Sequence, residues 1–287
     1  MISGQSFSRI FSVKSFTSCG KFTLHTYLTP VYNVCVQNLK AEDNLLPVTD
    51  LSDIHCHIVP GVDDGAKTIE DSMAIIRSEY ADGVRLIIAT PHFRHGMFET
   101  DRGLVEERFR QLLMQTANEY PDLELYLGCE YHNCLEKTAE FRTQPLFLMP
   151  DRRHVLLEFS EADSERDVRQ SIYDCLAGGV KPVIAHAERI LSMRNADRIC
   201  DIRAMGARVQ LNADSIIGRE GWGVKRFCAR LLKEGLVDFI GSDAHNMKDR
   251  APHIGACALY LKKKFGDGCV DALMRNNPRK LLTSAGN

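Results

Sequence analysis

The sequence predicts an α/β fold built on a parallel sheet. From about residue 47, seven short apolar runs alternate with segments of helical length. Strands that alternate with helices in this way are typical of parallel sheets. The runs are nearly continuous in Val, Ile and Leu, which indicates that both faces of each strand are covered. A closed barrel and an open doubly wound sheet both satisfy these observations.

The expected elements follow one another regularly along the chain. The seven expected strands cover residues 51–58, 84–92, 123–130, 154–160, 180–188, 207–213 and 237–245. Helical segments lie between most of them, and Thr68 with Asp71 has the spacing of a capping box at the start of the first helix. Gly83 and Gly235 stand where helices are expected to end.

Length and composition exclude several classes of protein. A chain of 287 residues is normal for a single α/β barrel, and a net charge of −2 does not indicate a nucleic-acid binder. No apolar stretch approaches the roughly 20 residues of a membrane span. The ten cysteines are scattered and form no CxxC pair, so we expect reduced thiols in a cytoplasmic protein. No glycine-rich nucleotide-binding motif follows an expected strand.

The N-terminal segment does not share the alternating pattern. Its first 40 residues are rich in Ser and Thr, contain four basic residues and lack acidic residues. This composition is similar to that of an organellar transit peptide, although a start site assigned too far upstream explains it equally well. We expect residues 1–46 to form a disordered extension and residues 47–287 to form one domain.

Potential metal ligands fall at or near the ends of six expected strands. They are His55 and His57, His92, Glu130, Glu158, His186, and Asp243 with His245. The C-terminal ends of parallel strands lie on one side of the sheet, where barrel enzymes build their active sites. Side chains two residues apart on a strand share a face, and imidazole and carboxylate groups together suit a divalent cation. Glu130 is the candidate for a carboxylate that bridges metals about 3.5–4 Å apart.

Other residues of similar chemistry are not expected in this site. The set-aside histidines are His25, His95, His132 and His154. Cys56 lies between two histidines and is expected on the opposite strand face, so it is not a candidate ligand. Cys269 and Arg275 have the C-x5-R spacing of cysteine-dependent phosphatases, but their neighbours have helical apolar spacing, and we interpret the match as coincidence.

The motifs resemble those of the polymerase-and-histidinol-phosphatase (PHP) superfamily, most closely its CpsB/CapC-type branch. The resemblance covers about residues 51–282 and consists of "DIHCHIVPGVDDG", "ATPHFRHGMFET", "GCEYH", "LLEFS", "VIAHAER", "GSDAHNMKDRAPH" and "NNPRKLL". It implies a distorted (β/α)7 TIM-like barrel with an irregular N-terminal extension and a centre of three metal ions. Manganese is the expected cofactor, and iron, zinc or cobalt remain alternatives.

The resemblance also implies a role for individual residues. The first metal would be held by His55, His57, Glu130 and Asp243. The second would be held by Glu130, Glu158 and His186, and the third by Asp64, His92 and His245. Arg189 and Arg250 match the arginines with which this family contacts phosphate.

The implied function is metal-dependent hydrolysis of phosphotyrosine in protein. Bound cations lower the pKa of water, and the resulting bridging hydroxide would attack phosphorus without a cysteine nucleophile. The implied partner is the C-terminal tail of a bacterial tyrosine kinase that controls capsular or exopolysaccharide synthesis. Two alternatives remain at this point: another PHP phosphoesterase such as a histidinol phosphatase, and a non-catalytic regulator that binds the kinase tail.

Overall fold

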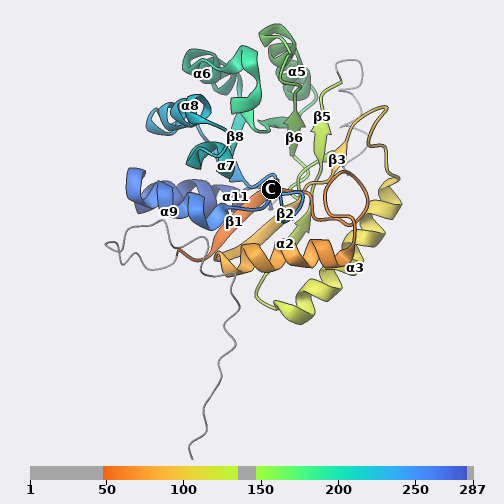
Figure 1. The fold of residues 1–287 in the computed structure, drawn as a ribbon. Helices are drawn as coiled ribbons and strands as arrows, with labels where there is room; N and C mark the ends of the chain where they lie inside the picture. Colours follow the sequence, from red (N-terminus) through yellow and green to blue (C-terminus); the bar gives the residue numbers. More distant parts are fainter. Residues whose placement is uncertain (1–47, 135–146, 283–287) are drawn as a thin grey trace, which may run out of the picture. The chain divides into compact units, whose positions relative to one another are not determined.

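The computed structural model describes residues 48–134 and 147–282, which form an α/β fold (Figure 1). The expectation for residues 1–46 falls outside the described residues. Every pairing between neighbouring strands is parallel, as the sequence predicts. The strands are β1 (Leu51–Cys56), β2 (Val84–Ala89), β3 (His92–Phe93), β4 (Glu124–Leu127), β5 (Glu130–His132), β6 (His154–Glu158), β7 (Lys181–Ile184), β8 (Arg208–Asn212) and β9 (Phe239–Gly241).

The described residues form nine strands in place of the expected seven, because two expected runs each break in the middle. One sheet has the order β1-β2-β4 and the other β3-β5-β6-β7-β8-β9. Pro91, which has no N–H group, lies between β2 and β3, and Gly128 lies between β4 and β5. Pairing continues across the breaks, since the backbone N–H of Gly128 donates to Ala89 O (2.8 Å) and that of Glu130 to Pro91 O (3.1 Å).

Backbone hydrogen bonds also link the first strand to the last. The N–H of Asp243 donates to His55 O over 2.8 Å, and the N–H of His57 donates to Ala244 O over 2.9 Å. These bonds place the segment that follows β9 beside the end of β1. The parallel strands therefore curl, and the segment after the last strand, β9, lies beside the C-terminal end of the first strand, β1.

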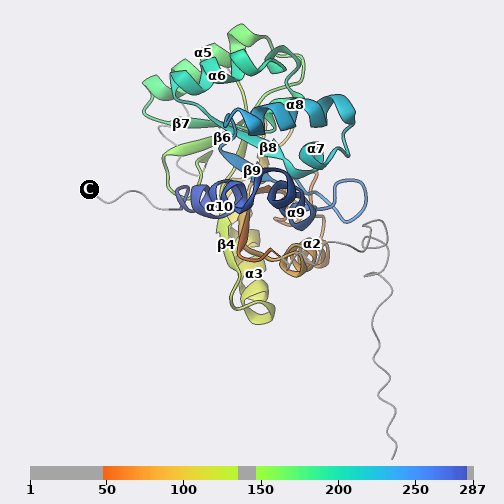
Figure 2. The same ribbon diagram turned by 90° about the vertical axis from the view of Figure 1, so that its left-hand side faces the viewer.

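Helices surround the strands, as Figure 1 and the rotated view in Figure 2 show. The helices are α2 (Ile69–Ala81), α3 (Arg102–Glu119), α5 (Glu165–Ala177), α6 (Ala196–Met205), α7 (Ala213–Ile217), α8 (Trp222–Lys233), α9 (Ile254–Phe265), α10 (Asp267–Asp271) and α11 (Asn277–Arg279). Short turns complete them: the 3-10 turns η3 (Ala187–Arg189) and η4 (Leu191–Met193) and the π-helical turn η5 (Ala272–Asn276). Among the described residues, none of these helices combines the length and hydropathy of a membrane span.

Local sequence signals place the helix ends where expected. Thr68 and Asp71 form the capping box of α2, with each side chain accepting from the other residue's backbone N–H. Gly83 follows α2 with φ 94° and Gly235 follows α8 with φ 66°. Both values lie in the left-handed region, which glycine adopts without steric cost.

The apolar core has two parts, which explains the near-continuous apolar runs. The smaller part includes Ile54, Leu86, Ile88 and Met149 and is separate from the larger part, which packs against the helices. Both faces of the strands are therefore covered.

The segment with the C-x5-R spacing is helical, as the sequence predicts. Cys269 lies in α10 and Arg275 in η5, where Arg275 donates to the carbonyl of Thr49. Burial raises the pKa of the Cys269 thiol, so its thiolate is disfavoured. This segment does not have the phosphate-binding loop of a cysteine-dependent phosphatase.

A pair of acids, Asp53 on β1 and Glu79 on α2, is completely buried away from the strand ends. Burial, followed by the nearby charges of Asp53 and Asp82, holds the pKa of Glu79 well above its usual range. The folded protein therefore keeps a proton on Glu79 at a pH where the unfolded chain releases it. Stability is lost as pH rises above the unfolded pKa of about 4.3.

Glu79→Gln should therefore reduce the fall in melting temperature between pH 5 and pH 8 and raise the melting temperature at pH 8 by a few degrees. The amide keeps the shape of the protonated carboxyl without its ionisation. Thermal unfolding across that pH range measures the effect, and the exposed Glu107→Gln on α3 serves as control. Parallel pH profiles for wild type and Glu79→Gln would contradict the prediction.

Candidate metal centre

All the histidines and acids predicted at strand ends lie together on one side of the strands. His55 is in β1 and His57 follows it; His92 is in β3, Glu130 begins β5 and Glu158 ends β6; His186 follows β7, and Asp243 and His245 follow β9. Apart from His186, these side chains and Asp64 form three compact groups. Within each group, one ligand atom of every residue lies within 4.8 Å of the ligand atoms of the others. The structure brings these side chains close together, and their role as ligands and the assignment of each residue to a metal stay predictions.

The first group consists of His55, His57, Glu130 and Asp243, all of them buried. The Nε2 atoms of the two histidines lie 3.2 Å apart, and they lie 3.0 and 3.1 Å from Glu130 Oε2. Asp243 Oδ1 is 3.6 Å from His55 Nε2 and 3.5 Å from His57 Nε2. Two nitrogens and two carboxylates thus face one point.

The second group brings Asp64 to two histidines. Asp64 Oδ1 lies 3.5 Å from His92 Nε2 and 3.4 Å from His245 Nε2. The ring of His57 lies beside both, with its centroid 4.3 Å from that of His92 and 3.8 Å from that of His245. His57 therefore stands between the first group and the second.

The third group surrounds Glu130 and Glu158. His186 Nε2 lies 3.0 Å from Glu130 Oε1 and 3.8 Å from Glu158 Oε1. The compact set around these two carboxylates contains His92, whose Nδ1 is 3.1 Å from Glu130 Oε2 and 3.8 Å from Glu158 Oε2. The resemblance places His186 in this set and His92 at the third metal, whereas the compact set in the structure contains His92 and not His186.

Burial and neighbouring charges give the imidazoles different protonation states. Burial alone would lower the pKa of His57, but the carboxylates of Asp63 and Glu130 raise it to about 10. Burial and the charge of His57 lower the pKa of His245 to about 4. Glu130 resists the effect of burial because His55 and His92 hold its pKa well below its usual range. The centre therefore holds ionised carboxylates beside a protonated histidine.

Several buried atoms of the centre have no hydrogen-bond partner among the described residues. They are His92 Nδ1, Glu130 Oε2, His186 Nδ1 and His245 Nε2. Glu130 Oε2 is close to imidazole nitrogens but does not have the directional geometry of a hydrogen bond with them. Buried atoms of this kind are costly unless something compensates them. Imidazole nitrogens and carboxylate oxygens are suitable donors for a divalent transition-metal ion, so the residues present fit such an ion.

Two residues that the sequence analysis did not identify, Asp63 and Gln210, orient the imidazole rings of candidate ligands. Asp63 Oδ2 lies 2.9 Å from His57 Nδ1, and Gln210 Oε1 lies 3.2 Å from His55 Nδ1. Contacts of this kind fix the ring orientation of metal-binding histidines. Asp63 could have been suspected from its place in the "VDDG" motif, whereas nothing near Gln210 in the sequence points to the site.

His132 corrects an interpretation made from the sequence, which set it apart from the site. Its Nδ1 lies 2.8 Å from Glu158 Oε2, and its Nε2 lies 3.4 Å from Ser160 Oγ. The signal was available, because His132 is two residues from Glu130 on the same short strand. His154, by contrast, begins β6 and pairs with Asp151 over 2.6 Å, at the opposite end of that strand.

Two candidate ligands have a backbone conformation that is uncommon for residues other than glycine. His186 has φ 30° and Asp243 has φ 56°. Left-handed backbone of this kind is costly and concentrates at functional sites, where surrounding contacts hold it in place. At Asp243 those contacts include the hydrogen bond from its N–H to His55 O.

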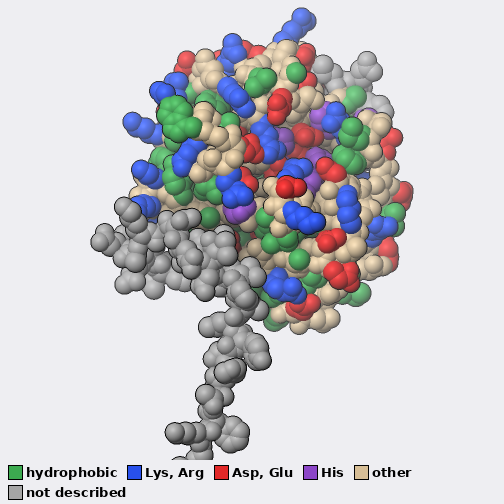
Figure 3. Space-filling model, in the orientation of Figure 1, with side chains coloured by type: hydrophobic (Ala, Val, Ile, Leu, Met, Phe, Trp, Pro, Cys, Tyr) green, Lys and Arg blue, Asp and Glu red, His purple; other side chains and the backbone are tan. Residues whose placement is uncertain are grey.

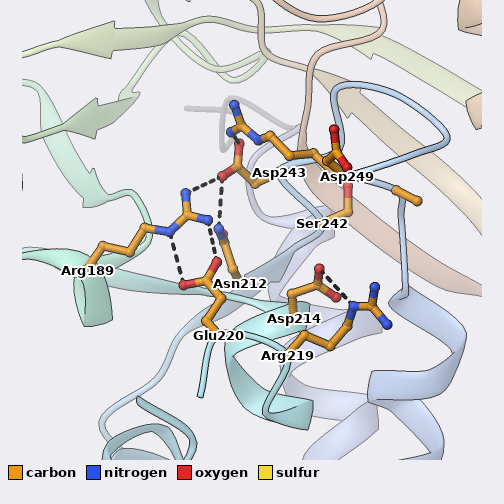
Figure 4. A pocket seen from close by; sticks show the side chains of 10 residues that line it. Arg189, Asn212, Asp214, Arg219, Glu220, Ser242, Asp243 and Asp249 are labelled. Atoms are coloured by element: carbon orange, nitrogen blue, oxygen red, sulfur yellow. Dashed lines mark hydrogen bonds and ion pairs between the residues drawn. The ribbon is translucent and has the colours of Figure 1, made fainter. Parts of the chain in front are cut away.

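The two predicted phosphate-binding arginines line a cavity of about 400 Å³ next to the metal-ligand cluster. Figure 4 shows Arg189 and Asn212 directed at Asp243. Arg189 Nη1 and Arg250 Nη2 each donate to a different oxygen of Asp243 over 2.7 Å. Arg189 also forms a two-pronged ion pair with Glu220, a residue that the sequence did not indicate. The cavity therefore presents guanidinium groups beside the candidate ligands.

The fold and the site together define an α/β protein with a buried histidine- and carboxylate-rich centre that suits several cations. A family model described as "Capsular polysaccharide synthesis, CpsB/CapC" matches residues 51–283. The protein belongs to this family, which confirms the resemblance seen in the motifs.

Two known proteins that are similar to this chain are both named tyrosine-protein phosphatases. The tyrosine-protein phosphatase CpsB of Streptococcus agalactiae serotype III (strain NEM316) is 32% identical over 236 residues, which cover 80% of this chain and 97% of that protein. The tyrosine-protein phosphatase YwqE of Bacillus subtilis (strain 168) is 35% identical over 225 residues, 78% of this chain and 89% of that protein.

Two solved structures are similar to this chain to different degrees. A structure from a study of YwqE from Bacillus subtilis and CpsB from Streptococcus pneumoniae, described as "unique metal-dependent tyrosine phosphatases", has 33% identity and a TM-score of 0.75. The match covers 82% of this chain and 96% of that one. A histidinol phosphate phosphatase from Lactococcus lactis has 14% identity and a TM-score of 0.51 over 76% and 94% of the chains, a likeness of fold alone.

Adding a divalent cation to the metal-free protein should raise its melting temperature and release protons at pH 7. A cation at 100 times its dissociation constant stabilises a fold by about 2.7 kcal/mol, which corresponds to roughly 5–10 °C for a domain of this size. Protons should be released because a histidine with a pKa of about 10, such as His57, must lose its proton to become a ligand.

Calorimetry in two buffers of different ionisation enthalpy counts the protons, and thermal unfolding measures the stabilisation. Glu130→Gln should lose most of both effects, whereas the exposed Glu107→Gln should respond as wild type does. A melting temperature that no cation changes, with no buffer dependence of the heat, would contradict the prediction.

Proposed function

We propose that this protein is a metal-dependent protein-tyrosine phosphatase. The observation that carries the proposal is the gathering of His55, His57, Glu130 and Asp243 into one buried group beside a cavity lined by arginines. The names of relatives with about one third sequence identity support it, since both are tyrosine-protein phosphatases.

The proposed cofactor is a cluster of three manganese ions; iron, zinc and cobalt suit the same donors. The first ion would be held by His55, His57, Glu130 and Asp243, the second by Glu130, Glu158 and His186, and the third by Asp64, His92 and His245. Glu130 suits a bridging role because its Oε2 contacts the first group and its Oε1 contacts His186. Bound divalent cations would lower the pKa of water and so supply a nucleophile at neutral pH.

The arginines would bind the phosphoryl group. Arg189 and Arg250 both contact Asp243 from the cavity, so their guanidinium groups already lie beside the candidate ligands. Guanidinium donors bind phosphate oxygens strongly and stabilise the charge that develops on them during transfer. Glu220 holds Arg189 through two of its nitrogens and so limits the orientations of the guanidinium.

A cysteine nucleophile is not required, and the described thiols near the centre are unsuited to that role. Burial raises the pKa of Cys56 well above its usual range and that of Cys129 to about 12. The phenol of tyrosine has a pKa of about 10, so it leaves more readily than an alkyl alcohol and depends less on a general acid.

Further parts of the proposal concern architecture and partners. We count each broken pair, β2 with β3 and β4 with β5, as one bent strand, which gives a distorted (β/α)7 barrel.

The proposed substrate is the phosphorylated tail of a bacterial tyrosine kinase, which the family's connection with capsular polysaccharide synthesis supports. The cytoplasmic location expected from the cysteines stays a prediction. No specific observation favours histidinol phosphate as substrate.

Chelation should abolish hydrolysis of O-phosphotyrosine, whereas alkylation with iodoacetamide should leave it largely intact. The reason is that the nucleophile is proposed to depend on cations and not on a thiol. Turnover of O-phosphotyrosine and histidinol phosphate, measured side by side before and after EDTA and after manganese is restored, tests both the chemistry and the substrate. Thiol-dependent activity that survives EDTA would overturn the proposal.

Arg189→Lys should lower kcat for O-phosphotyrosine by about 100- to 1000-fold, the range seen when a single donor to a transition-state oxyanion is removed. A lysine ammonium cannot pair with Glu220 and present a planar fork to phosphate at the same time. Steady-state kinetics with manganese present measure the effect. Arg208→Lys, which lies at the start of β8 and pairs with Asp238, is the matched control, and an equal loss in both variants would count against the role of Arg189.

A further inference from the structure

Three exposed large apolar side chains are close in sequence to residues that line the arginine cavity. Among the described residues eight large apolar side chains are exposed, and the most exposed is Trp222, at 73%. Trp222 is two residues from Glu220, Leu191 is two residues from Arg189, and Met247 is three residues from Arg250. Leu191 and Met247 are 53% and 45% exposed. Each of the three thus follows or precedes a residue that lines the cavity.

Topology places all three on the side of the strands where the site lies. Leu191 is in η4 after β7, Trp222 begins α8 after β8, and Met247 follows β9. Segments that follow the C-terminal ends of parallel strands lie on the same side as those ends. In Figure 3, histidines are visible at the centre of this face beside charged side chains, and hydrophobic side chains gather over α8.

The ring of Trp222 also has a neighbour that restricts it. The guanidinium carbon of Arg226, one turn further along α8, lies 5.4 Å from the ring centroid. A cation over an indole face is attractive even at an exposed site. The indole is therefore partly ordered before any ligand arrives, which lowers the entropy cost of binding to it.

We propose that Trp222, Leu191 and Met247 form an apolar rim that binds the side chains flanking the phosphotyrosine of a substrate peptide. This inference rests on the proposed function and adds a sequence preference to it: apolar residues within about three positions of the phosphotyrosine. An extended chain advances at most about 3.6 Å per residue, so the Cα atoms of Leu191 and Trp222 lie within about 7 Å of those of Arg189 and Glu220. A peptide residue next to a phosphotyrosine in the cavity spans a similar distance, which brings the rim within its reach.

The chemistry of the rim suits a peptide better than a small substrate. Trp and Met are enriched at protein interfaces, and truncating a tryptophan there often costs tenfold or more in affinity. O-Phosphotyrosine alone would fill the arginine cavity without reaching the rim. The rim would thus separate a protein phosphatase from an enzyme that acts on free phosphate esters.

The test measures peptide binding by the manganese-loaded full-length protein. Two peptides carry the same non-hydrolysable phosphonate analogue of phosphotyrosine, one flanked by Leu and the other by Ser at the two positions on each side. Trp222 is the single tryptophan of the chain, so its intrinsic fluorescence reports on the rim directly. Anisotropy of labelled peptides measures affinity in variants without tryptophan.

The Leu-flanked peptide should bind the wild type about tenfold more tightly than the Ser-flanked peptide and should change the tryptophan fluorescence. Trp222→Ala should lose most of this preference and Trp222→Phe should keep most of it. Tyr173→Ala is the matched control, because Tyr173 is 62% exposed near the far end of α5. Equal affinity for the two peptides in wild type, or an unchanged preference in Trp222→Ala, would overturn the proposal that the rim binds the flanking side chains.

Hydrolysis of O-phosphotyrosine by the wild type, measured in parallel, separates the two proposals. If the wild type hydrolyses O-phosphotyrosine but does not prefer the Leu-flanked peptide, the proposed peptide-binding rim is wrong and the proposed function stands. A retained Leu preference without hydrolysis under any added cation removes the proposed function and leaves a phosphotyrosine-binding surface.

Discussion

The carboxylate of Glu130 is buried completely, and its two oxygens contact imidazoles of His55, His57, His92 and His186. A charge removed from water in this way is tolerated only when it is paired. The four imidazoles come from segments up to 131 positions apart in the chain, at the ends of β1, β3 and β7. The strands must therefore curl into register for this carboxylate to be compensated, and the remaining unsatisfied donors and acceptors suit divalent cations.

The backbone around Glu130 departs from regular strand geometry in ways that serve the same contacts. The break at Pro91 leaves His92 paired with Glu130 in the short β3–β5 pairing. The left-handed conformations of His186 and Asp243 turn the chain at the ends of two other strands. Conformations of this cost persist where many surrounding contacts determine them, and here the contacts are those of the centre itself.

The environment changes in steps from the inside of the curled sheet to the surface around the site. Ile54 and its apolar neighbours fill the interior below the centre, while the cavity beside it is lined by charged groups such as Arg189 and Glu220. Apolar side chains return at the outer edge with Trp222. Water is excluded from the apolar layer beneath the centre, and this strengthens electrostatic interactions among the buried ligands.

The sequence by itself determined the alternation of strands and helices, the capping of α2 at Thr68, and the candidate ligands at strand ends. These features depend on local spacing, and parallel strands bring their C-terminal ends together whatever the neighbours are. Tertiary structure decided the strand breaks, the contact of His132 with Glu158, and the fork of Glu220 on Arg189. Such features depend on which segments become neighbours across the curled sheet. Local signals such as Pro91 and the two-residue spacing of His132 from Glu130 mark positions in the chain, but they do not identify the partner.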